Sequence, residues 1–432
     1  MMVQVADAMA RVLNEEANEL ARETQFVKRE RKLTGAIFAQ ALVFGWMADP
    51  EATVVDLSQA AAAVGVEISP QGLDQRFTEE AAEFLRQVLE AGVREVIRAE
   101  PVPIPILQRF NGVYVQDSSV VTLPEGLVAE WEGCTGAALK IQVRWDLLEG
   151  ALVHLELRPG KESDRAAPVQ EEPLPKGALR LADLGYFDLD QLKAIDDQEA
   201  YYLSRAWIQC VVYDEQGQRW ELGELLRRQQ TASVDLPVEL GAKHRLPCRL
   251  LAVRVPPEVA AERRRKIRAE AQRRGRTPSQ RQLELADWTI LFTNVPGEKL
   301  SLEEAVVVAR VRWQIELLFK LWKSHARIDE WRTENPWRIL CELYAKLLGM
   351  LLFHWVLVVS AWGYPNRSLF QAAQTVRKHA MSLACALASG LRQRLIGVLH
   401  TLQRCLAAGC RINKRKDKPH TYQLLLALTE PP

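Results

Sequence analysis

The chain has 432 residues, enough for two or three domains, and its composition of 48% apolar and 26% charged residues excludes a disordered protein. The formal net charge is only +1, but residues 263–281 hold nine Arg and Lys against one Glu. A local basic patch of this kind can bind polyanions although the total charge is near zero.

Cysteine usage and hydropathy indicate a cytoplasmic protein without a membrane partner. The seven cysteines include no C-x-x-C pair, which argues against a zinc site and a disulfide framework. Residues 1–14 lack the basic start and apolar run of a signal peptide. The most apolar stretch, residues 347–362, is short for a bilayer span and contains His354, so we expect a buried helix with a core histidine.

Residues 1 to about 100 are predicted to be helical. Residues 56–65 and 68–77 resemble a helix-turn-helix DNA reader, since Gly65 suits a helix end and Ser69-Pro70 suits a helix start. An ordinary helical hairpin is the alternative. The residues that would face a DNA groove are Gln71, Asp74, Gln75 and Arg76.

From about residue 110 the period of apolar residues changes to that of strands. Residues 112–117, 139–147 and 152–157 read as three strands, 178–185 as a fourth, 187–196 as a helix and 199–204 as a fifth strand. This order is typical of a ribonuclease-H-like α/β core. Residues 206–290 form a mixed, partly β insertion, and a strand at 289–293 precedes the next helical stretch.

That helical stretch, residues 312–323, carries its charges on one face. At roughly 100° per residue, its four charged side chains fall within an arc of about 80°, opposite an apolar side. They are Arg312, Glu316, Lys320 and Lys323. A carboxylate beside three cations suits a metal-binding acid that works next to a phosphate backbone. The alternative is a solvated surface helix with ion pairs four residues apart.

Two aspartates complete a set of carboxylates. Asp117 lies where an apolar strand is predicted to end, and Asp183 ends another strand just before Gly185. Each one alone could be a turn residue. Together with Glu316 they would supply three hard oxygen donors, which repel one another unless divalent cations lie between them. Two such ions about 3.5–4 Å apart can assist displacement at a phosphodiester.

The ordered motifs of residues 110–360 resemble a DDE transposase of the bacterial insertion-sequence group that forms DNA hairpins during cut-and-paste transposition. Its signature is tyrosine, two residues, arginine, three residues, glutamate, six residues, lysine. Arg312, Glu316 and Lys323 match this signature, while Ala309 replaces the tyrosine. The flanking matches are Tyr114-Val-Gln-Asp117, Asp183-Leu-Gly-Tyr-Phe187, Leu203-Ser-Arg205 and Thr293-Asn-Val-Pro296.

The resemblance implies roles for individual residues. Asp117, Asp183 and Glu316 would be the catalytic, metal-binding triad, with Mg²⁺ or Mn²⁺ in a two-metal site. The residues expected to contact DNA are Arg205, Trp288, Arg312, Lys320 and Lys323. Trp288 would stack on a base flipped out of the duplex, and a buried strand residue is the alternative for it.

The resemblance also implies a reaction and partners. The protein would bind terminal inverted repeats as a homodimer on synapsed double-stranded DNA. It would cut both strands through a hairpin and join the 3′ ends to target DNA. No P-loop is present, so no nucleotide cofactor is expected. Two alternatives remain: a transposase-derived DNA-binding regulator without catalysis, and a metal-dependent nuclease without strand transfer.

We therefore expect four parts in the chain: a helical DNA-binding domain at 1–105, a ribonuclease-H-like catalytic core at 106–205 and 291–335, an insertion domain at 206–290, and a helical region with a basic tail at 336–432.

Overall fold

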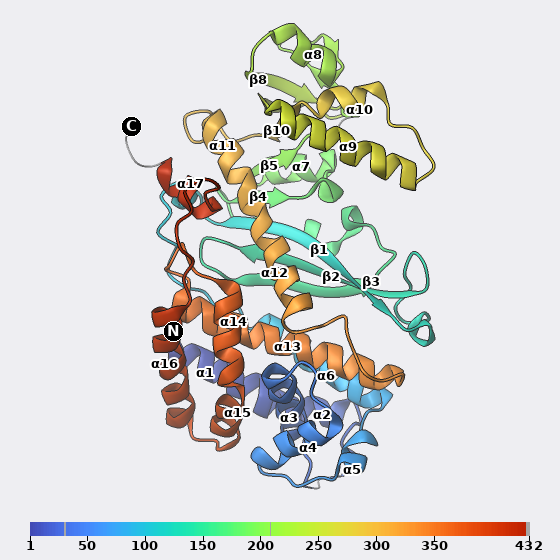
Figure 1. The fold of residues 1–432 in the computed structure, drawn as a ribbon, viewed down its shortest axis with the longest axis vertical. Coiled ribbons are helices and arrows are strands. Elements are labelled where there is room, and N and C mark those ends of the chain that lie inside the picture. Colours follow the sequence, from blue (N-terminus) through green and yellow to red (C-terminus); the bar gives the residue numbers. More distant parts are fainter. Residues whose placement is uncertain (30–31, 208, 429–432) are drawn as a thin grey trace. The chain divides into compact units, whose positions relative to one another are not determined.

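The protein has a mixed α/β architecture, with many helices and a large mixed sheet (Figure 1). The computed structural model describes residues 1–29, 32–207 and 209–428. The chain divides into two compact units. Unit 1 comprises Met1–Ile104, Asp117–Glu162 and Gln314–Tyr422, and unit 2 comprises Pro105–Gln116, Ser163–Trp313 and Gln423–Pro432. Each unit is therefore assembled from segments that are far apart in the sequence.

Unit 1 contains most of the helices together with two strands and the second half of strand β1. Its elements are α1 (Met2–Ala10), a π-helical turn (Arg11–Glu16), α2 (Ala17–Glu23), α3 (Gly35–Ala48), α4 (Val54–Ala63), α5 (Pro70–Asp74), α6 (Glu79–Arg94), β2 (Ala137–Asp146), β3 (Leu152–Pro159), α13 (Pro336–Ala361), α14 (Leu369–Lys378), α15 (Ala380–Ala388) and α16 (Arg392–Gly409). Helix α12 (Trp313–Ser324) lies in unit 1 except for its first residue, and α17 (Thr421–Ala427) begins there.

Helix α13 is the centre of unit 1. It packs against α3, α6 and α16, which come from both ends of the chain (Figure 1). By length and hydropathy α13 alone, among the described residues, could cross a membrane, but 94% of its most apolar window is buried. The expected buried helix is therefore confirmed. His354 is 1% exposed, its Nε2 lies 2.6 Å from the Gly150 carbonyl oxygen, and burial lowers its pKa to about 4.

The N-terminal helices begin where the sequence supplies side-chain caps. Thr53 and Asp56 form a capping box at α4, and the Ser69 hydroxyl accepts a hydrogen bond from the Gly72 amide at the start of α5. Gly65 has a φ of +105°, as a residue that ends a helix requires. The two helices of the predicted helix-turn-helix therefore form. The second has only five residues, and its Asp74 pairs with Arg338 of α13. Groove reading stays a prediction.

Unit 2 contains the first half of β1 and the remaining strands. Its elements are β1 (Val113–Leu123, which continues into unit 1), β4 (Leu179–Ala182), α7 (Leu189–Asp197), β5 (Tyr201–Arg205), β6 (Val212–Tyr213), β7 (Arg219–Trp220), α8 (Leu222–Gln229), β8 (Ser233–Leu240), β9 (Leu246–Arg254), α9 (Pro257–Arg273), α10 (Gln280–Leu285), β10 (Trp288–Thr293) and α11 (Leu302–Val308). The strand order is β1-β4-β5-β10-β9-β8-β6-β7. Strands β1, β4 and β5 are parallel, whereas β10 runs antiparallel to β5.

The Thr293-Asn-Val-Pro296 segment fastens β10 to β5. The Thr293 hydroxyl donates to the Tyr202 carbonyl oxygen at 2.6 Å, and the Asn294 side chain accepts from the Tyr202 amide at 2.8 Å. Asn294 also donates to the Asp196 carboxylate and the Ala200 carbonyl oxygen. This motif therefore fixes the beginning of β5, whose last residue is Arg205.

The buried His354 predicts a pH-dependent stability. Its pKa of about 4 lies below the ordinary 6.5, so the unfolded chain takes up a proton that the folded chain does not. Above about pH 6.5, His354 makes a constant contribution to the free energy of unfolding. As the pH falls from 6.5 towards 4, we expect it to lower the free energy of unfolding by about 1.4 kcal/mol per pH unit. Urea unfolding of the wild type and His354→Gln measures this difference.

The exposed His400 provides a matched control for this measurement. His400→Gln should keep the wild-type pH dependence, and His354→Gln should have a flatter one. Equal pH dependence in all three proteins would contradict a neutral, buried His354.

Candidate catalytic and DNA-binding site

Three residues of the predicted site follow a single row of the sheet in unit 2. Gln116 of β1 pairs with Ala182 of β4, and Ala182 pairs with Ser204 of β5. Asp117, Asp183 and Arg205 are the next residues along these three parallel strands. Because paired residues on neighbouring strands lie about 4.8 Å apart, Asp183 and Arg205 begin from adjacent backbone positions in unit 2, while Asp117 follows Gln116 at the point where the chain enters unit 1.

The expectation that Asp117 ends a strand is wrong. Strand β1 runs from Val113 to Leu123, so Asp117 is an internal residue of it. The pairing with β4 does end at Gln116, and beyond it β1 neighbours β2. Ser118-Ser119 interrupts the apolar alternation, but the β-branched Val120, Val121 and Thr122 continue the strand. The Asp117 carboxylate accepts a hydrogen bond from the Ser118 amide at 2.8 Å.

Asp183 lies directly after β4, as predicted. A 3₁₀ turn (Leu184–Tyr186) follows it, and the side chain of Asp183 is 42% exposed. Gly185 has a close neighbour there: a Cβ atom at this position would lie 3.3 Å from the carboxylate of Asp164, which would have to shift by a few tenths of an ångström. The sequence analysis missed Asp164, which belongs to a separate short turn at Asp164–Ala166. Only the folded chain brings this acid next to the Asp183 turn.

Arg312 lies beside Asp183 in unit 2. Its Nε is 3.9 Å from an Asp183 carboxylate oxygen, and its side chain is 14% exposed. Arg312 ends a 3₁₀ turn (Ala309–Arg312), and α12 starts one residue later than predicted. Ala309, at the position of the signature tyrosine, opens this turn and is half-buried. Glu316 stands in the first turn of α12, four residues after Arg312.

Within unit 1, α12 is fastened to the second half of β1. The Lys323 ammonium donates to the Val120 carbonyl oxygen at 2.8 Å. Ile315, Leu318 and Leu321 of the same helix are buried, whereas Glu316 is half-buried and Lys320 is exposed. The helix therefore has the predicted apolar and charged sides. Glu316 and Asp117 are carried by two elements of unit 1 that are in contact.

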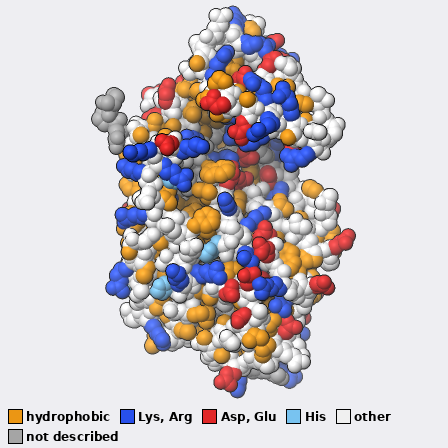
Figure 2. Space-filling model, viewed as in Figure 1, with side chains coloured by type: hydrophobic (Ala, Val, Ile, Leu, Met, Phe, Trp, Pro, Cys, Tyr) orange, Lys and Arg blue, Asp and Glu red, His pale blue; other side chains and the backbone are white. Residues whose placement is uncertain are grey.

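Arg205 and Trp288 line one cleft in unit 2. Its volume is about 370 Å³, and its walls include Arg263 and Lys266 of α9. Arg263 donates to the Trp288 carbonyl oxygen at 2.8 Å and to the Thr289 hydroxyl at 3.0 Å. Burial and the positive charge of Arg205 lower the pKa of Arg263. Figure 2 shows Lys and Arg side chains over the region that Figure 1 labels α9 and α10.

Trp288 is 8% exposed, and the guanidinium of Arg254 lies 4.9 Å from the centre of its ring. The alternative prediction, a buried strand residue, therefore holds for its packing, although the residue also borders the cleft. Arg263 and Lys266 were recognised in the sequence only as members of the basic run. The sequence of α9 could not show that Arg263 is the residue that faces β10, because nearly every neighbouring position is also charged.

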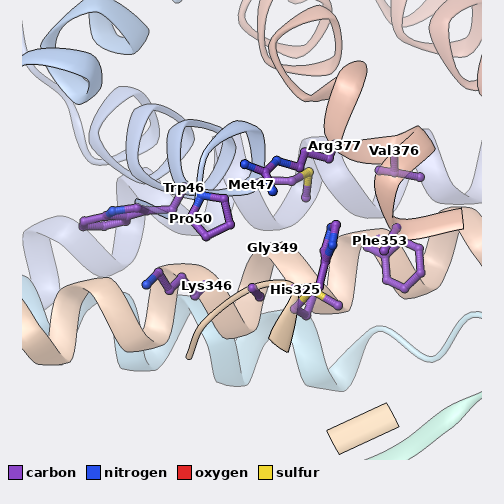
Figure 3. A pocket seen from close by; sticks show the side chains of 12 residues that line it. Trp46, Met47, Pro50, His325, Lys346, Gly349, Phe353, Val376 and Arg377 are labelled. Carbon is purple, nitrogen blue, oxygen red and sulfur yellow. The ribbon is translucent and has the colours of Figure 1, made fainter. Parts of the chain in front are cut away.

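Figure 3 shows a second, small cavity inside unit 1, of about 20 Å³, which is room for a single water. Trp46, Phe353 and Val376 make its wall largely apolar. Lys346 also reaches it, but its ammonium is bound to Glu342 and to the carbonyl oxygens of Arg327 and Glu330. This buried lysine therefore holds the segment between α12 and α13 in place.

Comparison with known proteins decides the family. A family model described as "Transposase DDE domain" matches residues 109–352, more than half of the chain. The chain belongs to the DDE transposase family. DDE transposases are enzymes that cut and transfer DNA with a divalent metal, so the predicted enzyme class and DNA partner are confirmed.

Curated relatives come from insertion sequences. The transposase for insertion sequence element IS231C of Bacillus thuringiensis subsp. berliner is 29% identical over 407 residues, covering 88% of this chain and 83% of the relative. That of IS231F from subsp. israelensis is 30% identical and covers 77% of this chain and 75% of the relative. That of IS1151 from Clostridium perfringens is 24% identical, with 78% and 76% covered. The chain is thus an insertion-sequence transposase.

Among solved structures, a cryo-EM structure of piggyBac transposase in a synaptic complex with hairpin DNA is similar with a TM-score of 0.47 and 10% identity. The similarity covers 92% of this chain and 85% of that one.

The contacts of α12 and of the turn before it predict which of their cations is available to DNA. Lys323 is bonded to β1 and Arg312 adjoins Asp183, whereas Lys320 is exposed and has no ion-pair partner among the described residues. The association constant K for a DNA duplex falls as salt is added. Lys320→Gln should make the plot of log K against log salt concentration less steep by about 0.9, the value of one phosphate contact. Fluorescence anisotropy with a labelled 30-base-pair duplex measures this slope.

Lys161→Gln is the matched control, because this exposed lysine pairs with Glu132. It should leave the slope unchanged. A Lys320→Gln slope equal to that of the control would mean that α12 does not face the phosphates.

Proposed function

We propose that this transposase binds the terminal inverted repeats of its element and catalyses cut-and-paste transposition at a site formed by Asp117, Asp183 and Glu316. The observation that carries the proposal is the shared row of the sheet: Asp117 and Asp183 both directly follow the paired residues Gln116 and Ala182. Arg312, next to Asp183, precedes Glu316 by one helical turn.

The order of the strands supports a ribonuclease-H-like core. In unit 2, β1, β4 and β5 lie side by side and parallel, with α7 between β4 and β5 in the sequence. In unit 1, β3 and β2 pair in antiparallel fashion and β2 neighbours β1. Three successive strands followed by two parallel strands with a connecting helix form the pattern expected for this core. The catalytic core at 106–205 and 291–335 is proposed with the boundaries expected from the sequence.

The proposed donor set fits a hard divalent cation such as Mg²⁺ or Mn²⁺, because all three groups are carboxylates and each is half-buried. Asp117, Asp183 and Glu316 would hold a two-metal site. Among the described residues, no three His, Cys, Asp or Glu side chains already form such a group. The proposal therefore requires the carboxylates to converge when DNA brings its phosphate. When bound, the divalent cations would stabilise negative charge on the attacking and leaving oxygens.

The neighbouring cations have distinct proposed tasks. Arg312 holds the Asp183 carboxylate on one side and would present its remaining N–H groups to a phosphate at the transposon end. Lys323 positions α12 on β1 through the Val120 carbonyl oxygen, and Lys320 would reach the DNA backbone. Arg205, with Arg263 and Lys266, would receive phosphates at the cleft beside Trp288.

The reaction is a series of in-line displacements at phosphorus without a covalent protein intermediate. Water attacks first, the P–O3′ bond breaks, and a free 3′ hydroxyl is released. That hydroxyl attacks a phosphate of the opposite strand, whose P–O3′ bond breaks to release the flanking DNA, and a hairpin closes. A second water attacks the hairpin phosphate and frees the 3′ hydroxyl again. The 3′ ends then attack target DNA. Both ends must be held during these steps, so a homodimer on synapsed DNA in the cytoplasm is proposed.

An assay distinguishes transposition from two alternative functions. A DNA-binding regulator has one feature in its favour, Ala309 at the tyrosine position, while the retained carboxylates argue for catalysis. A nuclease would cleave without joining. Incubation of paired transposon-end DNA with a target plasmid and Mg²⁺ separates the three: joined products support transposition, cut ends alone a nuclease, and bound uncut DNA a regulator.

The carboxylate assignment predicts a separation of binding from chemistry. Asp117→Asn, Asp183→Asn and Glu316→Gln should each abolish cleavage of transposon-end DNA, because an amide cannot supply the charged oxygen donor. DNA affinity should remain within a few-fold of that of the wild type. Cleavage on denaturing gels and anisotropy on the same preparations provide the two readouts. Asp164→Asn, the neighbouring acid outside the triad, should keep measurable cleavage.

Full Mg²⁺-dependent cutting by any one of the three variants would remove that residue from the site. Equal loss in Asp164→Asn would mean that the triad is assigned wrongly.

If a flipped base stacks on Trp288, replacement of this residue should affect the hairpin steps of the reaction. Stacking of a base on an aromatic side chain contributes roughly 1–3 kcal/mol, and that energy is needed when a hairpin distorts the terminal nucleotides. Trp288→Ala should slow hairpin formation or opening by about ten-fold or more and leave first-strand nicking nearly intact. Trp288→Phe, which keeps an aromatic ring in this buried position, should have a smaller effect on the hairpin steps.

Loss of packing is the competing explanation, since truncation of a buried Trp costs about 3–5 kcal/mol. A thermal melt separates the two. If nicking and hairpin formation fall together in a protein with a lowered melting temperature, Trp288 is a core residue without a role in stacking.

A further inference from the structure

The C-terminal helices of unit 1 come from a stretch without acidic residues. Residues 343–416 contain no Asp or Glu, although 55 of the 432 residues of the chain are acidic and a stretch of this length would average about nine. The same stretch contains eleven Lys and Arg. It includes α14, α15, α16 and most of the segment 410–418 that follows them. The near-neutral total charge of the chain conceals this separation.

Some of these cations have structural partners. Lys346 is buried and paired with Glu342, and Arg367 is half-buried with its guanidinium 3.4 Å from the centre of the Trp362 ring. Arg377 pairs with Asp49 and Arg392 with Asp7, which are the acids that neighbouring elements bring to these helices. These four side chains therefore contribute to folding.

The other cations face solvent. We define the C-terminal basic face as five of them together with Lys418, which follows Asp417 just beyond the stretch: Lys378, Arg394, Arg404, Lys414, Lys416 and Lys418. Each is exposed, and no carboxylate among the described residues lies within ion-pair distance of any of them. Figure 2 shows Lys, Arg and His side chains over the region that Figure 1 labels α14 and α16.

Contacts between elements bring these residues to one part of unit 1. Helix α14 packs against α16, and the chain after α16 returns to the start of α14, where the Ser368 amide donates to the Cys410 carbonyl oxygen at 2.9 Å. Within α16, Leu395, Leu399, Leu402 and Leu406 are buried. Arg394 and Arg404 lie about 80° apart on the opposite side at 100° per residue, so both project away from the core.

The six exposed cations have a single acidic residue next to them in the sequence, Asp417, and they repel one another, which is unfavourable unless a polyanion neutralises them. A DNA duplex presents one negative charge per about 1.7 Å of its axis and binds such surfaces through release of counterions. We propose that the C-terminal basic face binds duplex DNA through its phosphates, irrespective of sequence. This contact is separate from Arg205, Lys320 and the triad, and it does not depend on catalysis.

The test compares two triple variants of the full-length protein, without divalent metal. Lys378→Gln/Arg394→Gln/Arg404→Gln removes the helical part of the face, and Lys414→Gln/Lys416→Gln/Lys418→Gln removes the part after α16. Binding to two 30-base-pair duplexes of unrelated sequence is followed by anisotropy between 50 and 300 mM KCl. Each variant should make the plot of log K against log salt concentration less steep by about 2 to 3. It should also weaken binding to both duplexes equally.

The control makes the same change in charge at lysines that pair with acids in the protein. Lys161, Lys193 and Lys243 pair with Glu132, Asp197 and Asp190. Their triple replacement by Gln should leave the slope within about 1 of the wild type. Thermal melts should agree for all four proteins, since the replaced side chains are exposed.

Three outcomes would overturn the proposal: slopes of the two variants equal to that of the control, loss of affinity for only one duplex, or an unchanged slope with lost binding to vesicles of anionic phospholipid. Because the assay contains no metal and scores no cleavage, its failure leaves the proposed transposition chemistry untouched. Failure of that chemistry likewise leaves this result standing.

Discussion

The parallel pairing of β1, β4 and β5 is the constraint on which the proposed site depends. Its register aligns Gln116, Ala182 and Ser204, so that the residues after them, Asp117, Asp183 and Arg205, start from one edge of the row. A shift of one residue in a strand would turn its side chains to the other face. Such a shift would put the polar Gln116 and Ser204 in the places of the buried, apolar Val115 and Leu203, and packing on that face opposes it. The apolar core of the sheet therefore sets the spacing of the polar residues.

The helix α12 carries Glu316, the third carboxylate of the proposed site, and packing of the same kind holds this helix in unit 1. Its apolar side is buried, and Lys323 ties its second half to the carbonyl of Val120 on β1. Within unit 1, Glu316 is consequently carried by a helix that Lys323 bonds to β1. Within unit 2, Arg312 of the preceding turn adjoins Asp183. Ala309 begins the turn that precedes α12 and takes no part in these contacts.

Local sequence patterns predicted the elements but not the partners of each residue. Alternating apolar residues located β2, β3 and β4, and the side-chain caps located α4 and α5, because these signals act over a few neighbouring positions. The strand β1 was predicted too short, since Ser118-Ser119 resembles a turn until β2 provides a neighbour for the continuing strand. Asp164 beside Gly185 and Arg263 beside Trp288 depend on contacts across the fold, which no spacing encodes. The same holds for unit 1, where α13 packs on α3 and α6 from the other end of the chain.

The central claim is that Asp117, Asp183 and Glu316 hold the same divalent cations. It can be tested by replacing Mg²⁺ with Fe²⁺ in the DNA-bound protein and adding ascorbate and peroxide, which cleave the backbone next to the bound iron. The account predicts cuts near residues 117, 183 and 316 that disappear together when excess Mg²⁺ is added and are absent in Asp117→Asn. Cuts confined to one of the three segments, or cuts that persist in Asp117→Asn, would contradict it.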